Sequence, residues 1–195
     1  MTIGVETLSG GDLAQGLDAV AHLRIAVFRS YPYLYDGSLD YERSYLEKFA
    51  AAEGAIIAVA RDGDEVVGAA TGCPLVAEHE AFSQPLRSLG HDVNDIFYCA
   101  ESVLLPRYRG QGLGHRFFDL REAQARRLGA RKVAFCAVAR PAGHPLRPAD
   151  YVPLDGFWRK RGYAPVDGAV ARFAWKDIDQ PAETEKPLQF WMRQL

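Results

Sequence analysis

The sequence predicts a single α/β domain in which helices flank a mixed β-sheet. The 195 residues fall within the usual size of one domain, and 48% hydrophobic and 25% charged residues are typical of a globular core. Two apolar segments, residues 96–106 and 132–139, flank an amphipathic segment at residues 114–128. This order predicts two adjacent parallel strands joined by a helix.

The N-terminal third predicts one strand and two helices. Alternating apolar residues from Ile3 to Leu8 indicate a strand, and apolar residues at helical spacing from Leu13 onward indicate a helix that ends near Ser30. The aromatic segment YPYLYDGSLDY follows, and a second helix is expected from about Leu39 to Ala52.

The central segments predict a hairpin and then the strand–helix–strand unit. Residues 55–61 and 65–73 are rich in β-forming residues and flank Asp62-Gly63-Asp64, which is a hairpin signal. A polar insert follows, with a short helix expected around residues 81–89. The strand at residues 96–106 is nearly continuous apolar sequence, interrupted by Glu101-Ser102.

The C-terminal part gives weaker signals. A helix is expected near residues 154–161 and strands around residues 170–175. We expect one domain over residues 1–195, with a core of about 3–176 and a tail at 177–195. The tail ends in the apolar LQFWMRQL, which could dock on its own domain or on a second copy in a homodimer.

Charge and the spacing of special residues exclude several classes of protein. The net charge of −2 disfavours a main role in binding nucleic acid or a membrane surface. Cys73, Cys99 and Cys136 lie in apolar segments and are expected to be buried free thiols, and the five histidines lack metal-ligand spacing. We expect no metal. A signal peptide and an apolar segment of about 18 residues are both missing, so a cytoplasmic location is expected.

The glycine-rich segment Arg109-Gly110-Gln111-Gly112-Leu113-Gly114-His115 lies between the strand at 96–106 and the helix at 114–128. Its glycines allow backbone amides to turn toward one point, and the helix start adds free N–H groups and a positive dipole end. Such a loop suits a phosphate or diphosphate. The spacing matches neither the Walker A pattern nor the dinucleotide fingerprint. A plain connecting turn and an unrelated nucleotide-phosphate binder both stay open.

The spacing Arg109-x-x-Gly112-x-Gly114 resembles the acyl-CoA signature of the GNAT superfamily of N-acetyltransferases. The surrounding VLLPRYRGQGLGHRFFDL is similar to the central strand, loop and helix of that superfamily, and the order of elements is similar over roughly residues 3–176. The resemblance implies the GNAT fold, a mixed central sheet with two splayed parallel strands between which acetyl-CoA inserts.

The resemblance also implies which residues contact acetyl-CoA. The backbone of residues 103–105 would pair with the pantetheine arm, and an N–H near residue 103 or 104 would stabilise the oxyanion. The loop would hold the pyrophosphate. The expected cofactor-binding residues are Val103, Leu104, Leu105, Arg109, Gly110, Gln111, Gly112, Leu113, Gly114 and His115.

Acyl transfer needs a neutral amine, and an alkylammonium has a pKa near ~10. Glu101, which interrupts the apolar strand, is the first candidate for general base or amine anchor. It could instead be a structural residue bonded to Ser102 or to an arginine. Asp95 is the second candidate and could equally cap the strand start. Many members of the superfamily carry a tyrosine that acts as general acid where this sequence has Trp158. Tyr151 or Tyr163 could substitute for it, or the CoA thiolate could leave with help from water.

The aromatic segment after the first helix is expected to shape the acceptor site. Tyr31 and Tyr33, with Arg29, would suit a small substrate that carries a carboxylate; the alternative is a loop that closes the core. The sequence therefore predicts an acyl-CoA-dependent N-acyltransferase that acetylates a primary amine of a small molecule or peptide by direct attack. A non-catalytic acyl-CoA-binding module of the same fold is the main alternative.

Overall fold

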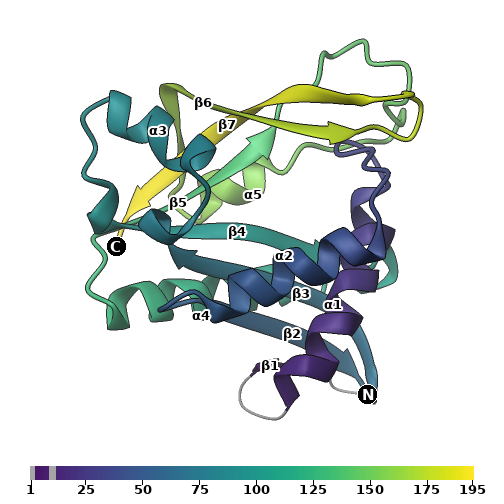
Figure 1. The fold of residues 1–195 in the computed structure, drawn as a ribbon, viewed down its shortest axis with the longest axis horizontal. Coiled ribbons are helices and arrows are strands. Elements are labelled where there is room, and N and C mark those ends of the chain that lie inside the picture. Colours follow the sequence, from purple (N-terminus) through teal and green to yellow (C-terminus); the bar gives the residue numbers. More distant parts are fainter. Residues whose placement is uncertain (1–2, 9–11) are drawn as a thin grey trace.

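The computed structural model describes residues 3–8 and 12–195 and contains a curved sheet covered by helices on both faces (Figure 1). The strands are β1 (Gly4–Thr7), β2 (Ile56–Asp62), β3 (Glu65–Pro74), β4 (Ile96–Leu104), β5 (Lys132–Val138), β6 (Ala164–Lys176) and β7 (Glu183–Gln194). The helices are α1 (Asp12–Phe28), α2 (Leu39–Ala51), α3 (Glu80–Ser88), α4 (Leu113–Arg127) and α5 (Asp155–Lys160).

The seven strands form one mixed sheet in the order β1-β2-β3-β4-β5-β7-β6. Strands β4 and β5 are parallel, and every other neighbouring pair is antiparallel. A parallel pair needs a crossover connection, which α4 supplies. The predicted α/β class and the parallel central pair are confirmed.

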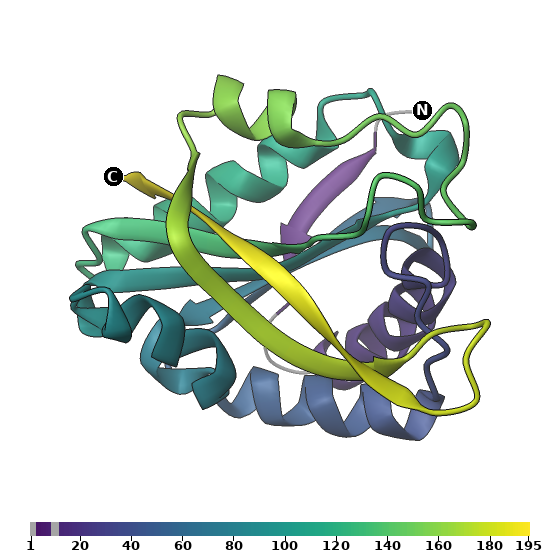
Figure 2. The same ribbon diagram turned by 90° about the horizontal axis from the view of Figure 1, so that it is seen from above.

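Helices α1, α2 and α3 lie on one face of the sheet, and α4 and α5 lie on the other (Figure 2). The first face is filled by two clusters of buried apolar side chains, which meet at Tyr33, Tyr35 and Ala100. The second face holds an aromatic cluster around Phe118, Phe135 and Trp191. The apolar spacing of the predicted helices therefore faces the sheet, as expected.

The C-terminal segment differs from the sequence-based expectation of a tail outside the core. Strand β7 lies between β5 and β6 and pairs with β5 from Lys132↔Gln194 to Val138↔Leu188. Phe190 and Trp191 of this strand are buried. The apolar LQFWMRQL therefore docks on its own domain as an interior strand. Among the described residues, no helix is both long and apolar enough to cross a membrane.

Candidate functional site

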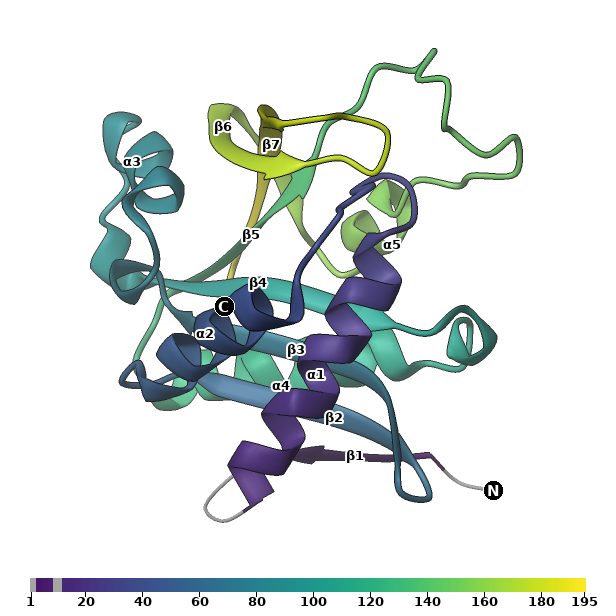
Figure 3. The same cartoon turned by 45° about the vertical axis from the view of Figure 1, so that its right-hand side comes forward.

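Strands β4 and β5 separate shortly after they begin (Figure 3). They pair only from Ile96↔Lys132 to Tyr98↔Ala134. Beyond that point β5 stays bonded to β7 on its other side, and β4 stays bonded to β3 as far as Leu104. We call the diverging part of the two strands the fork.

A β-bulge in β4 lies at the start of the fork. Tyr98 is paired with Cys73 of β3, whereas Glu101 is paired with Thr71, so β4 has one more residue than β3 over this stretch. The extra residue reverses the alternation of side chains. As a result Tyr98, before the bulge, and Val103, after it, both pack into the clusters on the α1–α3 face.

Of residues 103–105, which were predicted to pair with pantetheine, Leu104 is the one whose backbone groups are directed towards the fork. Leu105 N–H donates to Val67 O at 3.0 Å, and Leu105 O accepts from Tyr108 N–H at 3.0 Å. Both backbone groups of Leu105 thus already have partners within the chain, and its pairing with pantetheine stays a prediction. Since alternate residues of an antiparallel strand point opposite ways, the backbone groups of Leu104 face away from β3, towards the fork, and those of Val103 face β3.

The loop between β4 and α4 presents a row of free amides. Arg109 N–H donates to Pro106 O at 3.1 Å, and His115 N–H donates to Gly112 O at 3.0 Å. The five amides between them donate to no acceptor within residues 3–8 and 12–195: they belong to Gly110, Gln111, Gly112, Leu113 and Gly114. The amide of His115 donates inside the first turn and is not one of these five, so contact of His115 with a phosphate stays a prediction.

Two positions of this loop have a positive φ, a backbone conformation that favours glycine. Gly110 has φ +75° and Gly112, the residue before α4, has φ +80°. A Cβ at either position would meet no heavy atom within 4 Å, so the space above the loop is open. Free amides, open space and the positive end of a 15-residue helix fit a diphosphate group.

The side chains around the loop take different directions. Arg107 donates to both carboxylate oxygens of Glu65 at 2.8 Å, away from the amides. Arg109 stays exposed and donates from Nε to Leu104 O at 3.3 Å. His115 Nδ1 lies 3.1 Å from Arg161 Nη1 and must accept, because a guanidinium only donates. Arg109 has no carboxylate partner among the described residues, so it is a cation available to an anion at this loop.

Glu101 is held in a buried ion network on the α1–α3 face. Arg24 of α1 contacts both Glu101 and Glu42, and Tyr45 donates to Glu101 Oε2 at 3.4 Å. Burial alone would lower the pKa of Arg24, but Glu101 and Glu42 raise it above its usual value. One guanidinium between two carboxylates leaves a net negative charge beside the fork. The structural alternative for Glu101, a bond to an arginine, therefore describes its contacts.

A second buried arginine fixes the bulge from the opposite face. Arg121 of α4, which is 1% exposed, donates to Ser102 Oγ at 2.8 Å, Glu101 O at 3.0 Å and Thr71 O at 3.3 Å. The sequence analysis missed both Arg24 and Arg121. The available signal was their spacing: each lies four residues after an apolar residue, Val20 or Phe117, on the stripe of its helix that faces the core.

Several other catalytic predictions are not supported. Asp95 precedes β4 at the end where the strands are still paired, and its exposed carboxylate lies 4.0 Å from Arg131. Tyr163 donates to Glu122 in the core at 3.0 Å. Trp158 packs on Phe135 and Trp191 at ring-centroid distances of 5.0 and 5.1 Å. None of these side chains is directed into the fork by the contacts it makes.

The predicted acceptor segment lies beside the chain that follows β5. Tyr31 contacts Tyr151 edge-on at 4.7 Å, so two predicted site residues meet. Arg29 is paired with Asp36 at 2.9 Å. Burial raises the pKa of Tyr33, with smaller contributions from Cys136 of β5 and Glu101 of β4. Tyr33 also packs against both apolar clusters of the α1–α3 face, which contain Val103 of β4 and Cys136 of β5.

The cysteines are buried free thiols, as predicted. Cys136 Sγ lies 2.9 Å from Tyr98 Oη, and burial raises the pKa of this thiol to about 12. It is therefore an inert core residue at neutral pH. In the described part of the chain, no three His, Cys, Asp or Glu side chains are grouped closely enough to hold a metal ion.

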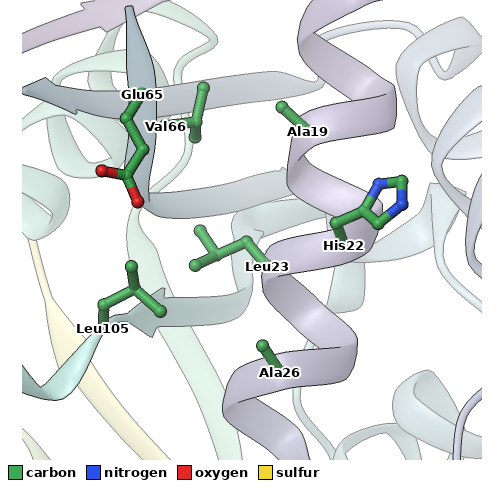
Figure 4. A pocket seen from close by; sticks show the side chains of 7 residues that line it. All are labelled: Ala19, His22, Leu23, Ala26, Glu65, Val66 and Leu105. Atoms are coloured by element: carbon green, nitrogen blue, oxygen red, sulfur yellow. The ribbon is translucent and has the colours of Figure 1, made fainter. Parts of the chain in front are cut away.

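A shallow groove lies between α1 and the adjoining ends of β3 and β4 (Figure 4). Leu105 and Val66 lie opposite α1, whose Leu23 and Ala26 form the other wall, and Glu65 lies on the strand side. Its lining is mostly apolar and contains none of the five free amides. The groove is therefore separate from the glycine-rich loop.

Comparisons with known proteins agree on one family. The family described as "Acetyltransferase (GNAT) family" matches residues 20–148. No sequence among curated proteins matches the chain.

Solved structures show the same fold at low sequence identity. An N-acetyltransferase from Staphylococcus aureus Mu50 is 12% identical, with a TM-score of 0.64 over 100% of this chain and 99% of that one. A ribosomal-protein-alanine N-acetyltransferase from Brucella melitensis is 14% identical, with a TM-score of 0.63 over 98% and 99%. The yncA structure from Salmonella typhimurium, solved with acetyl-CoA, is 15% identical, with a TM-score of 0.59 over 100% and 95%.

Proposed function

The chain belongs to the GNAT family of acetyltransferases, and from this premise we propose that it transfers an acetyl group from acetyl-CoA to a primary amine of a small molecule or peptide. The observation that carries the proposal is the row of five free amides at Gly110–Gly114. These amides follow β4, the strand in which the backbone groups of Leu104 face the fork.

We assign binding of the diphosphate of acetyl-CoA to the loop. The free amides donate to the phosphate oxygens, the dipole of α4 adds favourable potential, and Arg109 adds a cation. Acetyl-CoA supplies the activated acetyl group. The N–H of Leu104, which faces the fork, is the donor that would stabilise the oxyanion during attack.

We assign Glu101 the role of amine anchor in preference to general base. Both oxygens of the Glu101 carboxylate already have partners, since Arg24 contacts one and Tyr45 donates to the other. The Arg24 network carries one more negative than positive charge, so a substrate ammonium would offset it. The ammonium proton would then leave through water before the neutral amine attacks.

The aromatic segment around Tyr31 and Tyr33 would cover the acceptor. The carboxylate-bearing substrate expected from Arg29 loses its main support, because Asp36 already pairs with that guanidinium. We therefore favour amines without a carboxylate close to the reacting nitrogen.

Release of the CoA thiol tests the proposal. Purified protein is incubated with acetyl-CoA and a panel of primary amines, and free thiol is measured with a chromogenic disulfide. We expect thiol release with at least one amine, and a fall of about 10-fold or more in kcat/KM for that amine for Glu101→Gln, with CoA affinity nearly unchanged.

Two results would contradict parts of this account. CoA binding without thiol release for any amine would identify the non-catalytic acyl-CoA-binding module instead. Equal loss of CoA binding and turnover in Glu101→Gln would make Glu101 structural, and a melting curve of the variant separates that loss from unfolding.

A further inference from the structure

Arg140 lies two residues after β5, on the arm of the fork opposite Glu101, and its side chain is 8% exposed. Its guanidinium donates to the carbonyl oxygens of Pro32 at 2.8 Å and Tyr33 at 2.7 Å. It also forms a bidentate pair with Asp177 at 2.8 and 2.9 Å. One buried side chain thus joins β5, the segment between α1 and α2, and the turn between β6 and β7.

The network extends beyond Arg140, and its charged side chains are buried: Asp177 is 6% and Lys186 4% exposed. Lys186 of β7 lies 3.2 Å from Asp177 and also donates to Thr184 O at 2.7 Å. The Trp175 indole N–H donates to Tyr33 O at 3.0 Å, so this carbonyl accepts from both Trp175 and Arg140. Buried charges held this way need every partner, because an unpaired member would keep its full desolvation cost.

Tyr33 is the residue whose backbone Arg140 fixes and whose side chain lies at the fork. Its ring packs 4.5 Å from Phe28 and 6.1 Å from Trp175, between the two clusters on the α1–α3 face. Glu101 and Cys136, which influence its hydroxyl, lie on β4 and β5 beyond the last paired residues of the fork.

We propose that Arg140 is a positioning residue for the amine acceptor: it fixes Tyr33 over the fork and so sets the acceptor end of the site without contributing to the acetyl-CoA end. This inference rests on the proposed acetyl transfer. The separation is physical, since none of the contacts of Arg140 involves residues 103–115, where the free amides lie.

Arginine is needed here for its geometry as well as its charge. A planar guanidinium can pair with a carboxylate on one side and donate to two carbonyls on the other, whereas an ammonium cannot span all three. We therefore expect Arg140→Lys to retain part of the function of Arg140 and Arg140→Met to lose it.

Steady-state kinetics and calorimetry on the full chain test the proposal. For Arg140→Met we expect kcat/KM for the amine to fall at least about 10-fold through a higher amine KM, while the Kd for CoA changes less than about threefold. Arg140→Lys should lie between wild type and Arg140→Met. Arg172→Met is the matched control, because it removes an exposed arginine of β6 that pairs with Glu185 of β7 at 3.4 Å. For this variant we expect no change in the amine kcat/KM or in the Kd for CoA.

Hydrogen exchange supplies a readout that does not depend on finding an acceptor. The amides of Leu34 and Asp36 are bonded to Ser30 O and Lys176 O, and we expect faster exchange of both in Arg140→Met. If Arg140→Met does not fold, the same measurements on Arg140→Lys replace it, with smaller shifts expected.

Each result bears on a defined claim. Unchanged amine kinetics with unchanged exchange, or a loss of CoA affinity as large as the loss in amine kcat/KM, would overturn the proposal. Wild-type protein that binds no CoA would refute the proposed function alone. In that case faster exchange in Arg140→Met still supports positioning of the segment, and unchanged exchange overturns it.

Discussion

At the residue scale, buried Arg24 is the cation that two buried carboxylates share. Arg24 serves Glu42 and Glu101 at once, and the side chains of all three are at most 9% exposed. The guanidinium also lies 4.6 Å from the ring centroid of Tyr45, which adds a cation–π contact. Arg24 therefore ties α1 to α2 and to the fork strand β4.

Replacing Arg24 should destabilise the protein strongly. Arg24→Met leaves two buried carboxylates without their cation, so we expect unfolding free energy to fall by about 3–5 kcal/mol. Urea denaturation followed by circular dichroism measures this change.

The control for Arg24→Met is Arg43→Met, which breaks a pair with Asp18 at 2.6 Å in which both side chains are 46% exposed. Exposed pairs contribute at most about 1 kcal/mol. Equal small losses in the two variants would contradict the buried network.

Residue roles were only partly predictable from the sequence. Glu101 stood out because a charge interrupts an apolar strand, but its partner comes from a helix 77 positions earlier in the chain, and no local spacing connects them. Asp95 lies at the start of β4, as the sequence indicates, but the sequence does not show that β4 and β5 are still paired there. Strand periodicity likewise does not show which edge of the strand the amide of Leu105 faces.

At the element scale, the loop and helix α4 act as one anion-binding unit. Gly112 has φ +80° before the first residue of α4, and Gly129 has φ +78° just after its end. A Cβ at either glycine would meet nothing within 4 Å. The two positions therefore share backbone strain and differ in their distance from the free amides.

Because Gly112 and Gly129 have similar φ and similar open space, their alanine variants form a matched pair. Gly112→Ala and Gly129→Ala should each cost about 1–2 kcal/mol of stability, because both force a side chain into the left-handed region. We expect only Gly112→Ala to weaken CoA binding, by about 10-fold or more. Calorimetry with CoA measures this; equal affinities in the two variants would remove the loop from the binding site.

Local elements were the most predictable part of this fold. The hairpin glycine, the helical spacing and the two apolar strands each carry their signal within a dozen residues, and the structure confirms them. The bulge in β4 has no such local signal in the sequence, because it depends on the register of β4 against β3, including the pairs Tyr98↔Cys73 and Glu101↔Thr71.

At the scale of the whole molecule, β7 completes the sheet from the far end of the chain. It supplies the antiparallel neighbour of β5 along seven paired residues, and it carries the buried side chains of Phe190 and Trp191. The sequence showed an apolar end but not its partner, because the pairs between β5 and β7 join residues from 50 (Val138↔Leu188) to 62 (Lys132↔Gln194) positions apart. Strand β5, one of the two strands of the fork, is thus held in place by its pairing with β7.

Removing β7 should abolish folding. A chain that ends at residue 182 loses the burial of Phe190 and Trp191, each worth about 3–5 kcal/mol, against a total stability of about 5–15 kcal/mol. We expect it to aggregate or to lack a cooperative melt, as measured by gel filtration and circular dichroism. A monomeric product with the wild-type melting curve would contradict the interior position of β7.

The central claim is that backbone amides at the start of α4 bind the diphosphate of CoA. Calorimetric titration of the wild-type protein with CoA, and separately with pantetheine, which lacks that diphosphate, tests it most directly. The account predicts saturable binding of CoA at a single site and binding of pantetheine at least about 100-fold weaker. Equal affinities for both, or no heat with CoA, would contradict it.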